Sequence, residues 1–90
     1  MKIAVVGAGY VGLSIATLLS GKHDVTIIDV VKSKTEMINN RISPIKDATI
    51  DIYFKSELKL KATTLRNEAY EDADLIFVAG PTNYAAATNY

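Results

Sequence analysis

The chain has 90 residues, with 49% hydrophobic and 22% charged side chains, so it is an ordinary globular domain or part of one and not a disordered chain. Its ten basic and ten acidic side chains cancel, which gives no electrostatic basis for binding nucleic acid or an anionic membrane surface. It has no cysteine and no apolar run near the ~18 residues of a membrane span, so we expect a cytoplasmic protein without disulfides or thiolate metal sites.

The first predicted element is a short buried strand over residues 2–6, followed by three glycines with the spacing G-x-G-x-x-G and by a helix over residues 13–19. Gly7 permits a tight turn with a positive φ, Gly9 lets the backbone approach a pyrophosphate, and Gly12 lets the helix lie close to the strand. Free N–H groups at the start of the helix, together with its dipole, can receive phosphates. Strand, glycine turn and helix in this order predict the phosphate-binding corner of a dinucleotide-binding βαβ unit.

A second buried strand is predicted over residues 24–29, after a turn in which Gly21 is placed to take a left-handed conformation. Its last residue, Asp29, follows the glycines by about 20 residues, which is the offset of the carboxylate that binds the adenosine ribose. In a right-handed crossover the two strands are neighbours, so Asp29 should lie beside the glycine turn. A carboxylate there accepts hydrogen bonds from ribose hydroxyls and repels a 2′-phosphate, which favours NAD over NADP. We prefer this role to that of a solvated aspartate at a strand end.

A helix is predicted next, extending through residue 39 and opened by the capping-box spacing of Ser33 and Glu36. Lys32 and Lys34 fall where an adenosine phosphate or ribose edge would lie. We interpret Lys32 as an exposed lysine at the helix start. Position alone leaves Lys34 equally open to a solvated role and to a role at the cofactor.

After a break at Pro44, Asp47 is expected to cap a further helix over residues 48–56. Residues 58–63 alternate between apolar and polar, as is typical of a half-exposed edge strand. Asn67 can cap a short helical turn that follows this strand.

The last predicted strand covers residues 74–79 and is expected to be buried. In a Rossmann-type, doubly wound α/β fold this strand returns to the other side of the first one, which gives a partial parallel sheet in the strand order 3-2-1-4. The crevice then opens at the carboxyl ends of the first and fourth strands. Thr82 is the best-placed polar side chain to face the middle of a dinucleotide, although a hydroxyl that only satisfies its own turn is an equal alternative.

Four segments together are more specific than the glycines: V-x-G-x-G-Y-V-G-L-S at residues 5–14, I-I-D at 27–29, N-x-R-I-S-P-I at 39–45 and A-x-P-T-N-Y at 79–84. Over essentially all 90 residues the chain resembles the amino-terminal NAD-binding domain of the UDP-glucose/GDP-mannose dehydrogenase family, and within it the enzymes that act on UDP-glucose. The resemblance implies that the intact enzyme oxidises the C6 hydroxymethyl group of UDP-glucose to UDP-glucuronate in two hydride transfers that consume two NAD.

The resemblance also implies roles for individual residues. Tyr10 and Val11 would contact the pyrophosphate through their backbone, Asp29 would hold the adenosine ribose with Lys34 beside it, and Thr82 would lie near the nicotinamide half. No catalytic residue or metal ligand is expected in this chain, because the family uses a cysteine thiol assisted by lysine, asparagine and aspartate from later segments. The predicted cofactor-binding residues are Gly7, Gly9, Tyr10, Val11, Gly12, Asp29, Lys34 and Thr82.

The chain departs from the family pattern at two places on the crevice rim. Gly80 stands where a threonine is usual, and alanines at residues 85–87 stand where an acidic residue is usual. Two alternatives to this family are another Rossmann dehydrogenase, of the hydroxyacid or 6-phosphogluconate type, and a non-catalytic nucleotide-binding module.

We expect residues 1–90 to form the amino-terminal part of a dinucleotide-binding domain, with the remaining domains outside this chain. The chain should then be inactive alone, and the intact protein is expected to be a homo-oligomer. Its fourth strand would become an apolar sheet edge, so the isolated chain should be marginally stable or self-associate.

Overall fold

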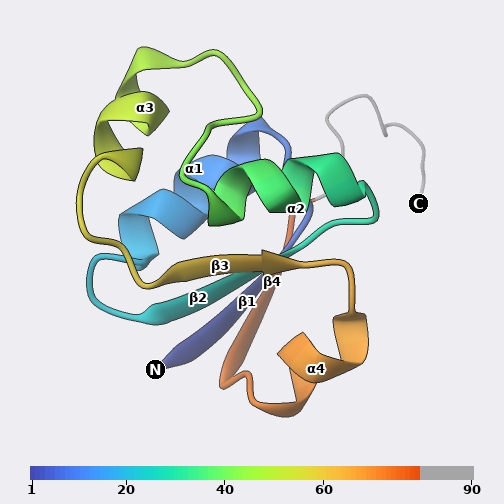
Figure 1. Cartoon of the computed structure of the whole chain (residues 1–90). Helices are drawn as coiled ribbons and strands as arrows, with labels where there is room; N and C mark the ends of the chain where they lie inside the picture. The colour runs from blue at the N-terminus through green and yellow to red at the C-terminus, as the bar shows by residue number, and fades with distance from the viewer. Residues whose placement is uncertain (80–90) are drawn as a thin grey trace.

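The computed structural model describes residues 1–79 as a four-stranded parallel sheet in the order β3-β2-β1-β4, with helices on both faces (Figure 1). The predicted α/β class and strand order are confirmed. The elements are β1 (Lys2–Val6), α1 (Tyr10–Leu19), β2 (Asp24–Ile28), α2 (Lys32–Asn39), α3 (Ala48–Phe54), β3 (Leu60–Thr63), α4 (Arg66–Glu71) and β4 (Leu75–Val78). Among the helices of residues 1–79, none combines the length and the apolar character that crossing a membrane would require.

The register of the parallel sheet brings the carboxyl ends of three strands together. The last residue of β1, Val6, is the partner of Ile28 in β2 on one side and of Val78 in β4 on the other. The glycine turn after β1 and the residue after β2, Asp29, therefore emerge at the same edge of the sheet. This is the edge at which open parallel sheets bind ligands.

The hydrophobic core lies between the sheet and the layer formed by α1, α2 and α3, while α4 lies on the opposite face (Figure 1). Alternate residues of each strand point into this core because successive side chains of a strand face opposite sides of the sheet. The strands contribute Ile3, Val5, Val25, Ile27, Leu60 and Ala62, and the helices contribute Leu13, Ala16, Ile38, Ile50 and Phe54. Burial of this apolar face fixes α1 against the sheet and so fixes where its first turn lies.

The first residues of α2 and α4 are determined by the ends of the preceding strands and not by the capping motifs in the sequence. The Asp47 cap is confirmed, since its Oδ1 accepts hydrogen bonds from two N–H groups in the first turn of α3. The capping box at Ser33 and the cap at Asn67 are wrong, because α2 and α4 begin earlier, after Val31 and Leu65, and neither has a side-chain cap.

The physical reason is a turn made by the residue at the strand end. Val31 N donates to Asp29 Oδ1 at 2.8 Å, and Leu65 N donates to Thr63 Oγ1 at 3.0 Å. Each turn directs the chain away from the sheet, so the helix starts at the next residue.

The left-handed residue at a helix end is also not the one expected. Gly21 does not have a positive φ, and Ser20, the residue that follows α1, has ordinary helical angles. Arg41, just after α2, has a φ of 61°, which is unfavourable for a residue with a Cβ. Its guanidinium donates hydrogen bonds to the carbonyl oxygens of Ile38 and Leu58, both at 3.0 Å, and these offset that cost.

The last strand is not buried in the described residues, whereas the expectation that it forms an apolar sheet edge in this chain is confirmed. β4 forms one edge of the sheet, and its residues Leu75, Ile76, Phe77 and Val78 are 43%, 45%, 37% and 76% exposed. Their apolar character suits a strand with neighbours on both sides, whereas residues 1–79 supply a neighbour only through β1.

Candidate cofactor-binding site

The turn after β1 can be built only with glycine at its first position. Gly7 has a φ of 106°, as expected from the spacing of the glycines, and its N–H donates to the carbonyl oxygen of Ile28 at 2.8 Å. A Cβ at Gly7 would overlap the carbonyl oxygen of Ala79 at the end of β4. The turn therefore passes tightly between the ends of the two strands that flank β1.

The other two glycines differ in what surrounds them. A Cβ at Gly12 would overlap the carbonyl oxygen of Gly7, so α1 lies against the turn as predicted. A Cβ at Gly9 would meet nothing within 4 Å. The folded chain does not need a glycine at position 9, and the space that this residue leaves open is available to a group outside the protein.

The first turn of α1 points unpaired N–H groups into this open space. The first hydrogen bond of the helix runs from Leu13 N to Gly9 O at 2.9 Å, so the N–H groups of Tyr10, Val11 and Gly12 have no partner within the helix. The first turn has no acidic residue and no side-chain cap, and Tyr10 and Val11 are 55% and 44% exposed. These N–H groups and the positive end of the helix dipole can bind an anionic group such as a phosphate.

Asp29 connects this turn to the next one. Its Oδ2 accepts a hydrogen bond from Ala8 N at 2.8 Å, and its Oδ1 accepts one from Val31 N at 2.8 Å. The carboxylate is half-buried and lies beside the glycine turn, as its position in the sequence predicted. Because an ionised carboxylate has about four lone-pair positions, about two remain for donors outside the protein.

The amide of Ala8 is the one component of this arrangement that the sequence did not indicate. It acts through its backbone N–H, and its side chain is completely buried. Any residue has such an N–H group, so no residue type could have signalled the contact. Only the pairing of β1 with β2 brings Ala8 to Asp29.

Of the remaining predicted residues, the structure describes the two lysines of α2 but not those after residue 79. Lys34 is half-buried in the first turn of α2, and Lys32 is exposed, as interpreted from the sequence. Thr82, Gly80 and the alanines at residues 85–87 lie outside the described residues. In residues 1–79, no group of three or more His, Asp or Glu side chains is arranged to hold a metal ion.

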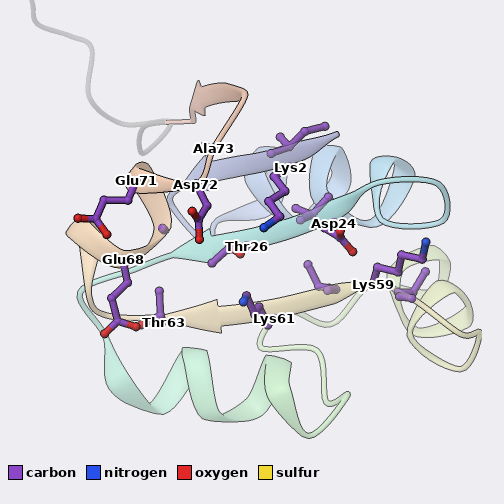
Figure 2. A pocket seen from close by; sticks show the side chains of 15 residues that line it. Lys2, Asp24, Thr26, Lys59, Lys61, Thr63, Glu68, Glu71, Asp72 and Ala73 are labelled. Carbon is purple, nitrogen blue, oxygen red and sulfur yellow. The ribbon is translucent and has the colours of Figure 1, made fainter.

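A separate hollow of the described chain lies over the sheet face that carries α4 (Figure 2). It has a volume of about 790 Å³, and none of the glycine-turn residues lines it. Its charged side chains come from the strands, as with Lys2, Asp24 and Lys61, and from α4, as with Glu68 and Glu71, and all five are exposed. It is a shallow, mixed-charge surface without convergent buried polar groups, so the glycine turn is the better candidate for a ligand site.

Comparison with known proteins agrees with this geometry. The sequence model of the UDP-glucose/GDP-mannose dehydrogenase family, NAD binding domain, matches residues 1–89. UDP-glucose 6-dehydrogenase of Streptococcus pneumoniae is 50% identical over 99% of this chain, and that of Campylobacter jejuni is 43% identical over 100% of it. The crystal structure of a ternary complex of GDP-mannose dehydrogenase from Pseudomonas aeruginosa superimposes with a TM-score of 0.85 and 32% identity over 91% of this chain.

These matches cover only a part of the known proteins. The chain spans 23% and 24% of the two bacterial UDP-glucose 6-dehydrogenases and 20% of the GDP-mannose dehydrogenase chain. The family match nevertheless extends over nearly every residue, from the first strand to beyond the fourth. The chain belongs to the UDP-glucose/GDP-mannose dehydrogenase family and corresponds to the NAD-binding domain of that family.

Proposed function

We propose that this chain binds NAD at the glycine turn, with the pyrophosphate on the N–H groups of α1 and the adenosine ribose on Asp29. The observation that carries the proposal is the position of the Asp29 carboxylate, hydrogen-bonded to Ala8 within the glycine turn. The Asp29 carboxylate thus lies next to the N–H groups of α1 that are proposed to bind phosphate, and it still has free acceptor positions. The two ribose hydroxyls of NAD are donors that match them.

The same arrangement supports a preference for NAD over NADP. A 2′-phosphate on the ribose would bring negative charge next to the Asp29 carboxylate, and like charges at hydrogen-bonding distance repel each other strongly. Lys34 lies in the first turn of the following helix, where we propose that it contacts the outer edge of the adenosine. Thr82 is proposed, from the resemblance alone, to contact the nicotinamide half.

For the intact protein, we propose the oxidation of UDP-glucose to UDP-glucuronate with two NAD. The two UDP-glucose 6-dehydrogenases at 50% and 43% identity support this substrate. GDP-mannose is the second candidate, supported by the 32% identity to GDP-mannose dehydrogenase. The 90 residues contain no cysteine, so the thiol that the family chemistry requires has to come from another part of the protein. Cytoplasmic location and homo-oligomeric assembly of the intact enzyme remain predictions.

Isothermal titration calorimetry of the 90-residue chain with NAD and with NADP tests the cofactor site. We expect NAD to bind more tightly, and we expect the substitution Asp29→Ala to weaken NAD binding by roughly 10- to 100-fold, since hydrogen bonds to a charged group contribute about 1.5–3 kcal/mol. Asp24→Ala is the matched control, because Asp24 lies at the other end of the same strand and is exposed.

Two results would contradict the proposal. One is equal affinity of the unmodified chain for NAD and NADP. The other is unchanged NAD affinity in Asp29→Ala with the fold intact by circular dichroism. The NADP comparison uses no substitution, so it remains informative even if Asp29→Ala loosens the turn.

A further inference from the structure

Both ends of α2 are bound to the sheet by hydrogen bonds that involve a side chain. At the start of the helix, Val31 N donates to Asp29 Oδ1 at 2.8 Å, which joins α2 to the carboxyl end of β2. At the end of the helix, Ala62 N donates to Asn39 Oδ1 at 2.8 Å, and Asn39 Nδ2 donates to Ala62 O at 2.9 Å. This second pair of bonds joins α2 to β3.

Asn39 binds the outer edge of β3, on the side away from β2. The carbonyl oxygens of Lys59 and Thr63 accept hydrogen bonds from N–H groups of β2 and of the residue after it, at 2.9 and 3.1 Å. Because backbone groups of a strand point alternately to its two sides, Ala62 directs its N–H and C=O away from β2. Ala62 is buried, and the Asn39 amide supplies the partners that its backbone groups need there.

These contacts form a closed ring that includes Asp29. Asp29 N donates to Thr63 O at 3.1 Å, and Thr63 directly follows Ala62 in β3. The ring, called the α2 ring below, consists of Asp29, Val31, α2, Asn39, Ala62 and Thr63, in that order. If one contact of a closed ring is lost, the segments on both sides of it can move. Asn39 therefore affects how firmly the first turn of α2 and the Asp29 carboxylate are held.

We propose that Asn39 is a positioning residue for the NAD site, an inference that rests on the function proposed above. Asn39 lies at the end of α2, whereas Lys34 lies in its first turn. By binding the end of the helix to β3, Asn39 holds Lys34 and the Asp29 carboxylate in the arrangement that receives the adenosine ribose. A site that is already ordered before the ligand arrives binds more tightly, because less conformational freedom is lost on binding.

Calorimetric titration of the variant Asn39→Ala with NAD tests this role. If α2 then occupies its binding position in only about a tenth to a third of the molecules, the apparent affinity for NAD falls by about 3- to 10-fold. Asp47→Ala is the matched control, because it also removes two hydrogen bonds, at the start of α3 and outside the α2 ring. It should lower the stability of the chain and leave the affinity for NAD unchanged.

A double variant separates positioning from a general loss of stability. In Asp29→Ala the ribose contact is absent and the α2 ring is already open at Val31. Adding Asn39→Ala to this variant should therefore weaken NAD binding further by less than about twofold, because residues that act through one network do not have additive effects. A purely structural role of Asn39 would weaken binding by the same factor with and without Asp29.

Amide hydrogen exchange, measured by NMR, tests the α2 ring without a ligand. Val31 N–H should exchange faster in Asn39→Ala than in the unmodified chain, because a loosened helix opens locally more often. In Asp47→Ala its exchange should be unchanged. Asn39→Asp keeps the acceptor for Ala62 N and loses the donor to Ala62 O. It should change NAD affinity and Val31 exchange in the same direction by smaller factors, which keeps the test informative if Asn39→Ala does not fold.

Four results, in variants that are folded by circular dichroism, would overturn the proposal. These are unchanged NAD affinity in the Asn39 variants, unchanged exchange of Val31 N–H in them, equal weakening of NAD binding by Asn39→Ala with and without Asp29, and a loss of NAD affinity in Asp47→Ala as large as in Asn39→Ala. The proposed function fails separately, if the unmodified chain binds no NAD or if Asp29→Ala binds it unchanged. When both of these behave as expected, unchanged NAD affinity in the Asn39 variants overturns only the positioning role.

Discussion

At the scale of single residues, the three glycines of the first turn are required for three different reasons. Gly7 is needed for its positive φ and its contact with Ala79, and Gly12 is needed because α1 lies against the turn. Gly9 has ordinary extended angles and open space around it. The fold therefore explains two of the glycines, and for the third we propose that the open space receives the pyrophosphate.

The substitution Gly9→Ala should separate folding from binding. A Cβ at position 9 meets no protein atom within 4 Å, so the loss of stability should stay below about 1 kcal/mol, the difference between glycine and alanine at an N-cap. The same Cβ projects into the proposed pyrophosphate position, so the affinity for NAD should fall by at least about tenfold, or about 1.4 kcal/mol. Chemical denaturation and calorimetric titration of the same preparation measure both quantities.

Gly21→Ala serves as the control, since Gly21 is exposed, has no positive φ and has open space at its Cβ. It should change neither stability nor NAD affinity appreciably. Unchanged NAD binding in Gly9→Ala would contradict the assignment of this turn to the pyrophosphate.

At the scale of elements, the strand ends decide where helices begin. Asp29 and Thr63 each close a turn on the N–H group two residues later, and α2 and α4 start directly after these turns. Among the helices of residues 1–79, the one capped by a side chain is α3, which does not follow a strand and is capped by Asp47. Capping motifs in the sequence were reliable where no strand end competed with them.

This difference leads to a stability prediction for the caps. Asp47→Ala removes the acceptor for Thr49 N and Ile50 N at 2.9 and 3.1 Å, and the free energy of unfolding should drop by about 1 kcal/mol. Asn67→Ala should change it by less than about 0.5 kcal/mol, because Asn67 lies inside α4, is exposed and caps nothing. Urea denaturation of the two variants makes the comparison, and equal losses would contradict it.

The sequence predicted the helices and strands well where neighbouring residues in the chain determine the local structure. The glycine spacing located β1, the turn and α1, and the offset of Asp29 located the end of β2. Contacts between distant segments could not be predicted in this way. Asn39 closes the edge of β3 through Ala62, 23 residues further along the chain, and nothing in the local sequence of either residue indicates the other.

The burial of β4 could not be settled from its own residues for a related reason. Its four apolar residues are typical of a strand with neighbours on both sides, but periodicity does not reveal whether those neighbours are present. Within the described chain only β1 is there. The apolar residues of β4 show that the strand is suited to pairing on both sides. Residues 1–79 supply the pairing strand on one side, which is β1.

At the scale of the whole molecule, the described residues carry the proposed cofactor site, and the 90 residues contain no cysteine. We expect the 90-residue chain, supplied with NAD and UDP-glucose, to form no NADH above background, because the resemblance places the lysine, asparagine and aspartate of the family's chemistry in later segments and the chain has no cysteine. Absorbance at the NADH maximum measures this, with a full-length relative as the positive control. Turnover by this chain would contradict the proposed division between a cofactor-binding part and a catalytic part.

The double hydrogen bonding of Asp29 has a consequence for the evolution of cofactor preference. A change from NAD to NADP in such a site requires the loss of the negative charge beside the ribose. Here that charge also holds Ala8 and Val31, so its removal would release the glycine turn and the start of α2 together. No single substitution at position 29 supplies both a neutral ribose partner and two acceptors for those N–H groups. If Asp29 sets the proposed preference for NAD, a switch to NADP would first need a second residue to take over its hydrogen bonds to Ala8 and Val31.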